Sequence, residues 1–143
     1  MPDAITLRAF AWSDYETVIA LWRATGLGIT VSDSRDGLAL TLDHDAELFV
    51  VAEADGQLVG ALLGTFDGRR GWLHHLAVAP AWQGRGIGRR LVAEVEARLR
   101  ARGCAKVNLH VEPDNAEVTG FYDRIGYAQH EILFMEKWLR PGE

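Results

Sequence analysis

The sequence is short of several features, and each shortage excludes a class of protein. It holds a single cysteine, Cys104, so no disulfide can form within the chain, which fits a reducing cytoplasm. No window approaches the ~20 consecutive apolar residues that a membrane-spanning helix needs. Residues 1–10 lack the basic start and the apolar run of a signal peptide, so none is expected.

Basic residues are in the minority. The chain has 20 acidic and 15 basic side chains, with a formal net charge of −5. Because no basic stripe stands out, nucleic-acid binding is disfavoured. The length of 143 residues, 48% of them hydrophobic, predicts a single domain over residues 1–143 with one hydrophobic core.

The most informative stretch runs from residue 72 to residue 103. A short apolar strand is followed by a loop with glycine at positions 84, 86 and 88, and an amphipathic helix opens directly after it. Gly103 is expected to end this helix, and Glu94 and Arg98 form a favourable i,i+4 pair on its polar side. The apolar side recurs at helical spacing and consists of Ile87, Leu91, Val92, Val95 and Leu99.

The first turn of this helix carries positive charge, which is unfavourable at a helix N-terminus. A helix N-terminus has a partial positive charge, yet Arg85, Arg89 and Arg90 gather there. The arrangement is favourable if an anion lies there, because backbone N–H groups and guanidinium groups then both bind it. Glycines in the loop let a phosphate approach the main chain closely. The alternative is a glycine-rich turn whose arginines contact only solvent.

The type of phosphate ligand follows from what the loop lacks and what it resembles. A Walker loop needs Gly-Lys-Ser/Thr after the glycines, and a dinucleotide fingerprint needs glycine at position 89. The loop instead resembles the acetyl-CoA signature of the GNAT (GCN5-related N-acetyltransferase) superfamily, reading Gln83-Gly84-Arg85-Gly86-Ile87-Gly88 and then Arg89. It follows a strand ending in Leu76-Ala77-Val78-Ala79-Pro80, as the family's fourth strand does. The resemblance implies that residues 76–78 pair with the pantetheine arm of acetyl-CoA and that residues 83–89 hold its phosphates.

The remaining pattern predicts an α/β fold with a mixed sheet and helices on both faces. The expected order is βααβββαβαβ, which is also the order of the GNAT fold. Ser13 and Glu16 suggest a capping box at the first helix, and Asp55-Gly56 suggests a tight hairpin. Strands are expected at 4–9, 47–53, 57–66, before Pro80, at 106–111 and, as one or two closing strands, within 127–139; helices are expected after Ser13, at 35–44, after the glycine loop and at 116–125.

Acetyl transfer from a thioester to an amine requires a neutral amine, a stabilised oxyanion and a proton for the departing thiolate. Tyrosine has a pKa near 10 and keeps its proton at neutral pH. By resemblance, Tyr122 in the segment 121–127 is this general acid, and the alternative is a core aromatic beside Phe121. The resemblance also implies an oxyanion-binding N–H near Val78. It gives Asn115 a hydrogen bond to the cofactor arm, unless Asn115 only caps a helix.

The general base is the least defined part of the site. The resemblance to ribosomal-protein N-terminal acetyltransferases aligns His110 with their glutamate on the fifth strand. An imidazole is largely neutral at pH 7 and can take a proton directly or through a water. A structural role for His110 stays open, and the further candidates for the base are Glu112, His74, His75 and Asp67.

These residues predict an acetyl-CoA-dependent N-acetyltransferase that moves the acetyl group directly to a primary amine, without a metal. The amine is either a protein N-terminal α-amine or a small molecule. The alternative is an acyl-CoA sensor on the same fold, whereas a nucleotide-binding regulator is opposed by the glycine spacing. The sequence identifies neither the acceptor nor the oligomeric state, and a homodimer is left open.

Overall fold

The structure, a computed structural model, describes residues 4–112 and 118–142. One five-stranded sheet has the order β1-β2-β3-β4-β5. Neighbouring strands are antiparallel except β4 and β5, which are parallel, so the predicted mixed sheet is confirmed. The strands are β1 (Ile5–Ala9), β2 (Phe49–Ala54), β3 (Gln57–Phe66), β4 (Gly71–Val78) and β5 (Val107–Leu109).

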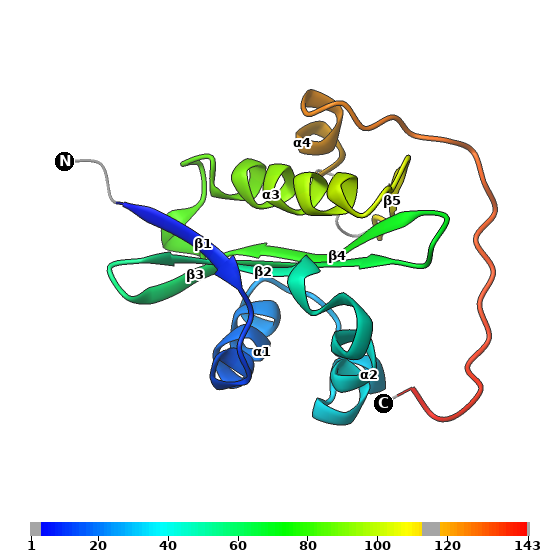
Figure 1. The fold of residues 1–143 in the computed structure, drawn as a ribbon, viewed down its shortest axis with the longest axis horizontal. Helices are drawn as coiled ribbons and strands as arrows, with labels where there is room; N and C mark the ends of the chain where they lie inside the picture. The colour runs from blue at the N-terminus through cyan, green and yellow to red at the C-terminus, as the bar shows by residue number, and fades with distance from the viewer. Residues whose placement is uncertain (1–3, 113–117, 143) are drawn as a thin grey trace.

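Helices cover both faces of the sheet, as predicted. Helices α1 (Tyr15–Ala24) and α2 (Arg35–Asp45) lie on one face, and α3 (Ile87–Ala101) and α4 (Thr119–Arg124) lie on the other (Figure 1). Short 3₁₀ turns connect them: η1 (Trp12–Asp14), η2 (Val31–Asp33), η3 (Ala46–Leu48) and η4 (Pro80–Trp82). None of the helices in the described ranges combines the length and the apolar character needed to cross a bilayer.

Each face of the sheet has its own apolar core. On the α3 face, the buried side chains of the helix are the predicted stripe of Ile87, Leu91, Val92, Val95 and Leu99. On the α1–α2 face, Trp22 stacks on Phe49 with ring centroids 5.9 Å apart, and both rings are fully buried. Full burial of one large apolar side chain stabilises the fold by roughly 1.5–3 kcal/mol, so the sheet is fixed from both sides.

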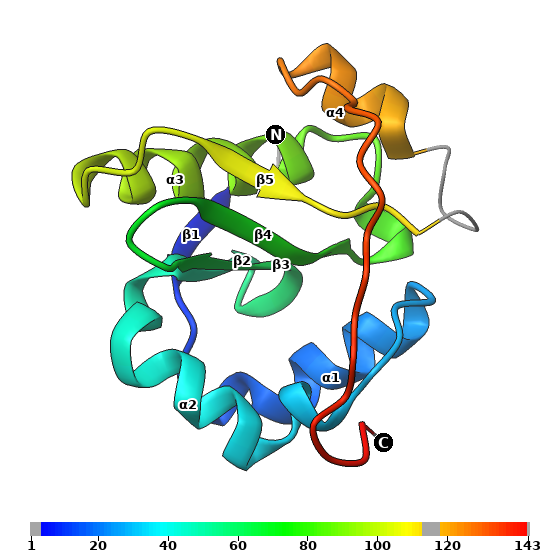
Figure 2. The same ribbon diagram turned by 90° about the vertical axis from the view of Figure 1, so that its right-hand side faces the viewer.

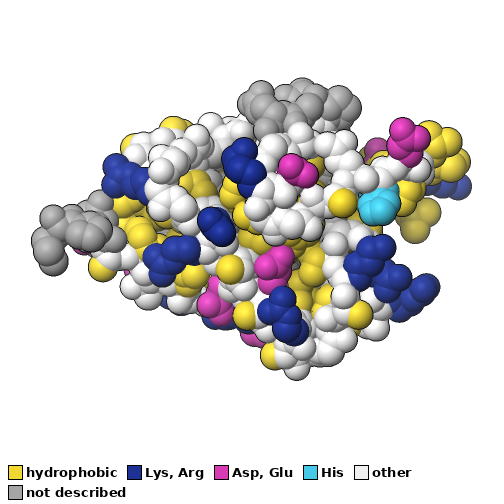
Figure 3. Space-filling model, turned by 90° about the horizontal axis from the view of Figure 1, so that it is seen from above, with side chains coloured by type: hydrophobic (Ala, Val, Ile, Leu, Met, Phe, Trp, Pro, Cys, Tyr) yellow, Lys and Arg dark blue, Asp and Glu magenta, His cyan; other side chains and the backbone are white. Residues whose placement is uncertain are grey.

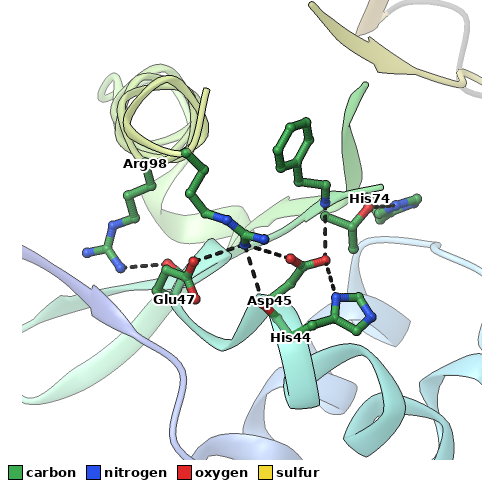
Figure 4. A network of polar contacts seen from close by, with 8 residues as sticks. His44, Asp45, Glu47, His74 and Arg98 are labelled. Carbon is green, nitrogen blue, oxygen red and sulfur yellow. Dashed lines mark hydrogen bonds and ion pairs between the residues drawn. The ribbon is translucent and has the colours of Figure 1, made fainter. Parts of the chain in front are cut away.

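A buried carboxylate joins the two layers at one end of the sheet (Figure 4). Asp45, at the end of α2, is fully buried and accepts hydrogen bonds from Arg102 (2.7 Å) and from the backbone N–H of Phe66 (3.1 Å). His44 Nδ1 lies 2.9 Å from the same carboxylate. A buried charge without partners costs several kcal/mol. This cluster therefore fixes the positions of α2, β3 and the end of α3 relative to one another.

The capping box predicted at Ser13 is wrong. Helix α1 begins at Tyr15 with Asp14 as its N-cap, and this N-cap makes no side-chain hydrogen bond to the helix. The Asp14 carboxylate instead accepts from the backbone N–H of Ala11 (2.8 Å) and from the Arg8 guanidinium on β1 (2.7 and 2.8 Å). A charge-assisted bidentate pair is stronger than a neutral cap, so the tertiary contact decides where the helix starts.

The closing strands predicted within 127–139 are also wrong. The chain from residue 128 to residue 142 forms no strand with any described segment. It leaves α4 and passes the side of the sheet where β5 lies, and it reaches the α1–α2 side (Figure 2), where Gly142 O accepts from Val31 N at 2.6 Å. Its large apolar residues are exposed, among them Ile132, Leu133, Met135 and Leu139. An apolar run predicts burial, but it does not provide the hydrogen-bonded neighbour that a strand needs.

Candidate active site

The candidate site begins where β4 and β5 separate. Their pairing covers only Gly71 to Leu73 on β4. Farther along, Ala77 and Val78 still pair with β3, but the opposite edge of β4 has no partner among the described strands. Residues 76–78, predicted to bind the pantetheine arm, lie on this stretch. An extended ligand can pair with such an edge as an added strand.

The glycine loop follows directly. The side chain of Gln83 folds back, and its Nε2 donates to Val78 O at 2.9 Å, which ties the loop to the end of β4. Gly84 and Gly86 have φ angles of +78° and +80°, a conformation that a residue with a Cβ rarely adopts. No heavy atom lies within 4 Å of a Cβ added at either glycine. The loop therefore exposes its main chain to any ligand that approaches.

The loop ends at an uncapped helix N-terminus. Gly86 is the N-cap of α3 and provides no side-chain cap. The helix makes its first hydrogen bond from Arg90 N to Gly86 O at 3.1 Å, so the amides before Arg90 have no acceptor within the helix. Arg85 and Arg89 are exposed beside them, and the Arg85 guanidinium lies 4.5 Å from the Trp82 ring centroid.

This end of α3 has the features of an anion site. Figure 3, which looks down on the α3 face, shows basic side chains on the left, the side on which α3 begins, and a second group of them on the right. Amides without an acceptor within the helix, the helix dipole and guanidinium groups all favour a negative group. Phosphate binding by residues 83–89 stays a prediction, and these are the groups that would perform it.

Tyr122 lies in the core of the same face. Its side chain is buried, and its described contacts are the rings of Phe121 (5.0 Å between centroids) and Tyr127 (5.6 Å). The Phe121 ring lies 3.5 Å from the position that a Cβ on Gly88 would take. Contacts thus lead from the start of α3 through Phe121 to Tyr122. Burial raises the pKa of Tyr122 to about 12, so the phenol keeps its proton at neutral pH.

His110 lies at a different place, just after β5. Its ring is held between Trp72 (5.1 Å between centroids) and Phe134 of the C-terminal segment (4.5 Å). The residue is exposed. Its described contacts are therefore aromatic, and the structure shows no carboxylate of the described chain that orients its imidazole.

The comparison with known families identifies the chain. Residues 8–127 match the family described as the acetyltransferase (GNAT) family. The chain belongs to this family. The predicted GNAT fold and the predicted class of acetyltransferase are confirmed by this match, which covers both the glycine loop and Tyr122.

Individual relatives agree with the assignment. Acetyltransferase YE1169 of Yersinia enterocolitica (serotype O:8 / biotype 1B) is 39% identical over 133 residues, which are 93% of this chain and 94% of the relative. A PaiA N-acetyltransferase from Thermoplasma acidophilum, solved with coenzyme A, has a TM-score of 0.79 at 22% identity over 90% of this chain and 92% of that one. Ard1 from Thermoplasma volcanium has a TM-score of 0.80 at 22% identity, covering 90% of this chain and 85% of that chain. The two structures show the shared fold.

The other predicted site residues of this GNAT chain fall in several places. Asn115 lies outside the described residues. Asp67 accepts from the backbone N–H groups of Arg69 (2.7 Å) and Arg70 (2.8 Å), and these bonds lower its pKa, so it acts as a turn residue. Glu112 is exposed.

The two neighbouring histidines on β4 have polar partners. His74 Nε2 lies 3.0 Å from Thr65 Oγ1 on β3. His75 Nε2 lies 3.3 Å from Asp33 Oδ1. Desolvation by the protein atoms around the ring lowers the pKa of His74, and the neighbouring imidazoles His75 and His110 lower it further. Sequence reasoning missed Asp33, since no motif links the loop after α1 to β4.

Proposed function

We propose that this GNAT chain transfers an acetyl group directly from acetyl-CoA to a primary amine, either a protein N-terminal α-amine or a small molecule. One observation carries the proposal: the edge of β4 that no described strand pairs with, the glycine loop and the start of α3, which has no side-chain cap, follow one another without interruption. They offer strand-like partners for an extended arm and then amides for a pyrophosphate. The coenzyme A bound by the PaiA neighbour supports this choice of donor.

In this proposal the main chain does most of the binding. Leu76, Ala77 and Val78 offer backbone groups to the pantetheine arm, and a backbone N–H near Val78 stabilises the oxyanion. The phosphates lie against Gln83, Gly84, Arg85, Gly86, Ile87, Gly88 and Arg89. Ile87 is the one buried member of this set, because its side chain anchors α3 in the core.

No metal takes part, and neither nucleic acid nor a membrane is a partner. The proposed compartment is the cytoplasm, where the unpaired Cys104 stays reduced.

Tyr122 supplies the proton for the leaving thiolate. The burial that raises its pKa keeps the phenol protonated until the C–S bond breaks. The same dry surroundings disfavour a free thiolate, which raises the proton affinity of the sulfur. The same apolar environment therefore raises the pKa of the acid, Tyr122, and the proton affinity of the thiolate that it protonates. The family resemblance by itself names His110 as the base that takes the proton of the amine.

Two measurements test the proposal. Isothermal titration should show binding of acetyl-CoA and CoA in preference to ATP and NAD. A thiol-release assay with acetyl-CoA and a panel of amines should show transfer to at least one of them; the panel contains N-terminal peptides, polyamines, amino acids and aminoglycosides. Binding of acetyl-CoA without thiol release for any amine would instead identify a sensor. Preference for ATP or NAD would contradict the assignment of the loop.

A further inference from the structure

The α1–α2 face holds a carboxylate that is fixed by its own loop. Asp33 of η2 is 4% exposed. Its Oδ2 accepts from the backbone N–H of Thr30 at 3.0 Å, and its carbonyl accepts from the Tyr15 hydroxyl of α1 at 2.7 Å. Burial alone would raise the pKa of Asp33, but the hydrogen bonds from His75 and Thr30 outweigh this and lower it. Asp33 is therefore an ionised group with one oxygen bound to the loop and the other, Oδ1, facing His75.

His75 is held in an unusual backbone conformation to meet this oxygen. Its φ is +55°, in the left-handed region, which costs a residue with a Cβ about 1–2 kcal/mol. The register explains why: Ala61 pairs with Ala77 and Leu63 with His74, so β4 has one more residue than β3 in this interval. Such a bulge re-aims a side chain. Strain of this kind persists where surrounding contacts over-determine it, and it clusters at active sites.

The surroundings of His75 are polar on several sides. Its ring lies 4.6 Å from that of Trp22, whose indole N–H is buried with no hydrogen-bond partner among the described residues. The titratable groups next to the pair are Tyr15 from α1, whose hydroxyl donates to the Asp33 backbone carbonyl, and His74 from β4, which in turn has His110 as a neighbour. The side chain of His75 is 25% exposed, so a proton taken up there can pass to solvent.

The position of His75 along β4 places the pair of His75 and Asp33 next to the proposed site of the thioester. It directly precedes residues 76–78, whose free edge is the proposed place of the thioester arm. With Nε2 turned to a carboxylate, the neutral ring carries its proton on Nε2 and keeps the lone pair of Nδ1 as an acceptor. His110, by contrast, is packed between Trp72 and Phe134.

We propose that His75, oriented by Asp33, accepts the proton of the acceptor ammonium group in place of His110. This inference rests on the proposed acetyl transfer. The freed amine lone pair then bonds to the acetyl carbon, and the C–S bond breaks. Tyr122 gives its proton to sulfur, and the second proton lost by nitrogen as the amide forms replaces it. The first proton leaves from His75 to solvent, so one proton is released per turnover. Asp33 is a positioning residue, because it acts through His75.

The kinetic test follows acetyl transfer from acetyl-CoA to two probes, spermidine and a tetrapeptide with a free α-amine. His75→Asn is the matched variant, because asparagine tolerates a left-handed backbone better than most residues. Its kcat should fall about 10²–10⁴-fold near pH 7, and the loss should shrink at higher pH, where solvent deprotonates the amine. The Kd of acetyl-CoA should stay unchanged. Asp33→Asn should shift the pH profile in the same direction by less. The exposed His130→Gln should keep the wild-type profile.

A comparison with His110→Gln decides between the two imidazoles. If His110→Gln removes the acidic limb of the pH–rate profile and His75→Asn keeps it, the proposal is overturned. A second readout needs no turnover: NMR of isotope-labelled histidine should place the proton of neutral His75 on Nε2, and Asp33→Asn should weaken this preference. A neutral His75 protonated on Nδ1 alone would also overturn the proposal. A wild type with the expected tautomer that acetylates neither probe nor any amine of the panel contradicts the proposed function instead.

Discussion

On the α3 face of the sheet, the candidate site is built from main chain. The edge of β4 that no described strand covers, the glycine loop and the first turn of α3 occupy residues 76–89, and their amides are the proposed binding groups. On the α1–α2 face, the candidate site is built from side chains. Asp33 of η2, His74 and His75 of β4 and His110 after β5 are brought together by the fold. Strand β4 is the one element that contributes to both.

The difference between the faces suggests a division of labour. A main-chain site recognises a donor whose arm and phosphates are the same in every reaction. A side-chain site can be changed by single substitutions, as the choice of acceptor requires. Changes on the α3 face should therefore alter donor binding or the chemistry with every amine. Changes on the α1–α2 face should alter proton transfer from the acceptor and its pH dependence.

The largest effect is expected for Tyr122→Phe. The substitution keeps the packing of the ring against Phe121 and removes only the hydroxyl. Loss of a general acid lowers kcat by about 10²–10⁴-fold, whereas the Kd of acetyl-CoA should hardly change. Because a proton donor is missing, raising the pH should not rescue this variant, unlike His75→Asn. Measuring kcat with several amines at two pH values tests both the loss of rate and the absence of rescue at higher pH.

Tyr127→Phe is the matched control for this substitution. The Tyr127 hydroxyl donates to Glu96 Oε2 at 2.7 Å, and its ring packs beside that of Tyr122. The same chemical change there should lower stability slightly and leave kcat as it is. A Tyr122→Phe enzyme with full kcat would remove Tyr122 from the mechanism. Equal losses in both variants would point to packing instead of proton transfer.

The same division between the faces decides what the sequence could reveal. The glycine loop and α3 are contiguous, and their chemistry follows from local rules: glycines at left-handed positions, an apolar stripe and an uncapped N-terminus. The Asp55-Gly56 hairpin was predicted for the same reason, and both residues have positive φ. Glu94 and Arg98 form the expected pair at 2.8 Å. Local signals of this kind need no knowledge of the rest of the fold.

The contact between Asp33 and His75 could not be predicted in this way. It depends on a bulge in β4 and on where η2 lies, and neither leaves a pattern in the sequence. The capping box at Ser13 failed for a related reason, because the chain first forms the turn η1, in which Asp14 accepts from Ala11 N–H and from Arg8 on β1. Glu96 and Arg100 have the same i,i+4 spacing as Glu94 and Arg98, but the Glu96 carboxylate accepts from the distant Tyr127.

The C-terminal segment shows the limit of apolar patterns. Composition within 127–139 predicted strands, but β5 has only three residues and pairs with β4 alone among the described strands. Phe134 packs on His110, while Leu133 is 93% exposed. A hydrophobic run thus indicates that a segment favours an apolar partner. It does not indicate which partner, and strand pairing depends on that.

A smaller effect is expected for Gly86→Ala, which tests the main-chain character of the α3 face. Gly86 has a positive φ with open space around a new Cβ, and so does Gly68 in the β3–β4 turn. Both Gly→Ala changes should therefore lower the free energy of unfolding by about 1–2 kcal/mol through backbone strain. Only Gly86→Ala should also weaken acetyl-CoA binding, by roughly tenfold or more, or about 1.4 kcal/mol. Calorimetric Kd values and chemical denaturation check this, and equal Kd values for both variants would contradict the loop assignment.

The smallest effect concerns the arginine at the start of α3, and its sign is the informative part. A cation near a helix N-terminus is unfavourable and one near the C-terminus is favourable, each by about 0.3–1 kcal/mol at low salt. Arg89 is exposed in the first turn of α3, and Arg100 is exposed in its last turn. Without ligand, Arg89→Gln should therefore raise the free energy of unfolding by that amount, and Arg100→Gln should lower it. With CoA, Arg89→Gln alone should lose affinity, and the loss should shrink as salt screens the charge. Denaturation curves of the two variants, each recorded with and without CoA, measure these changes in stability and in affinity. If Arg89→Gln were neutral in the free protein and in the complex, Arg89 would contact only solvent, and the anion site would depend on the main chain alone.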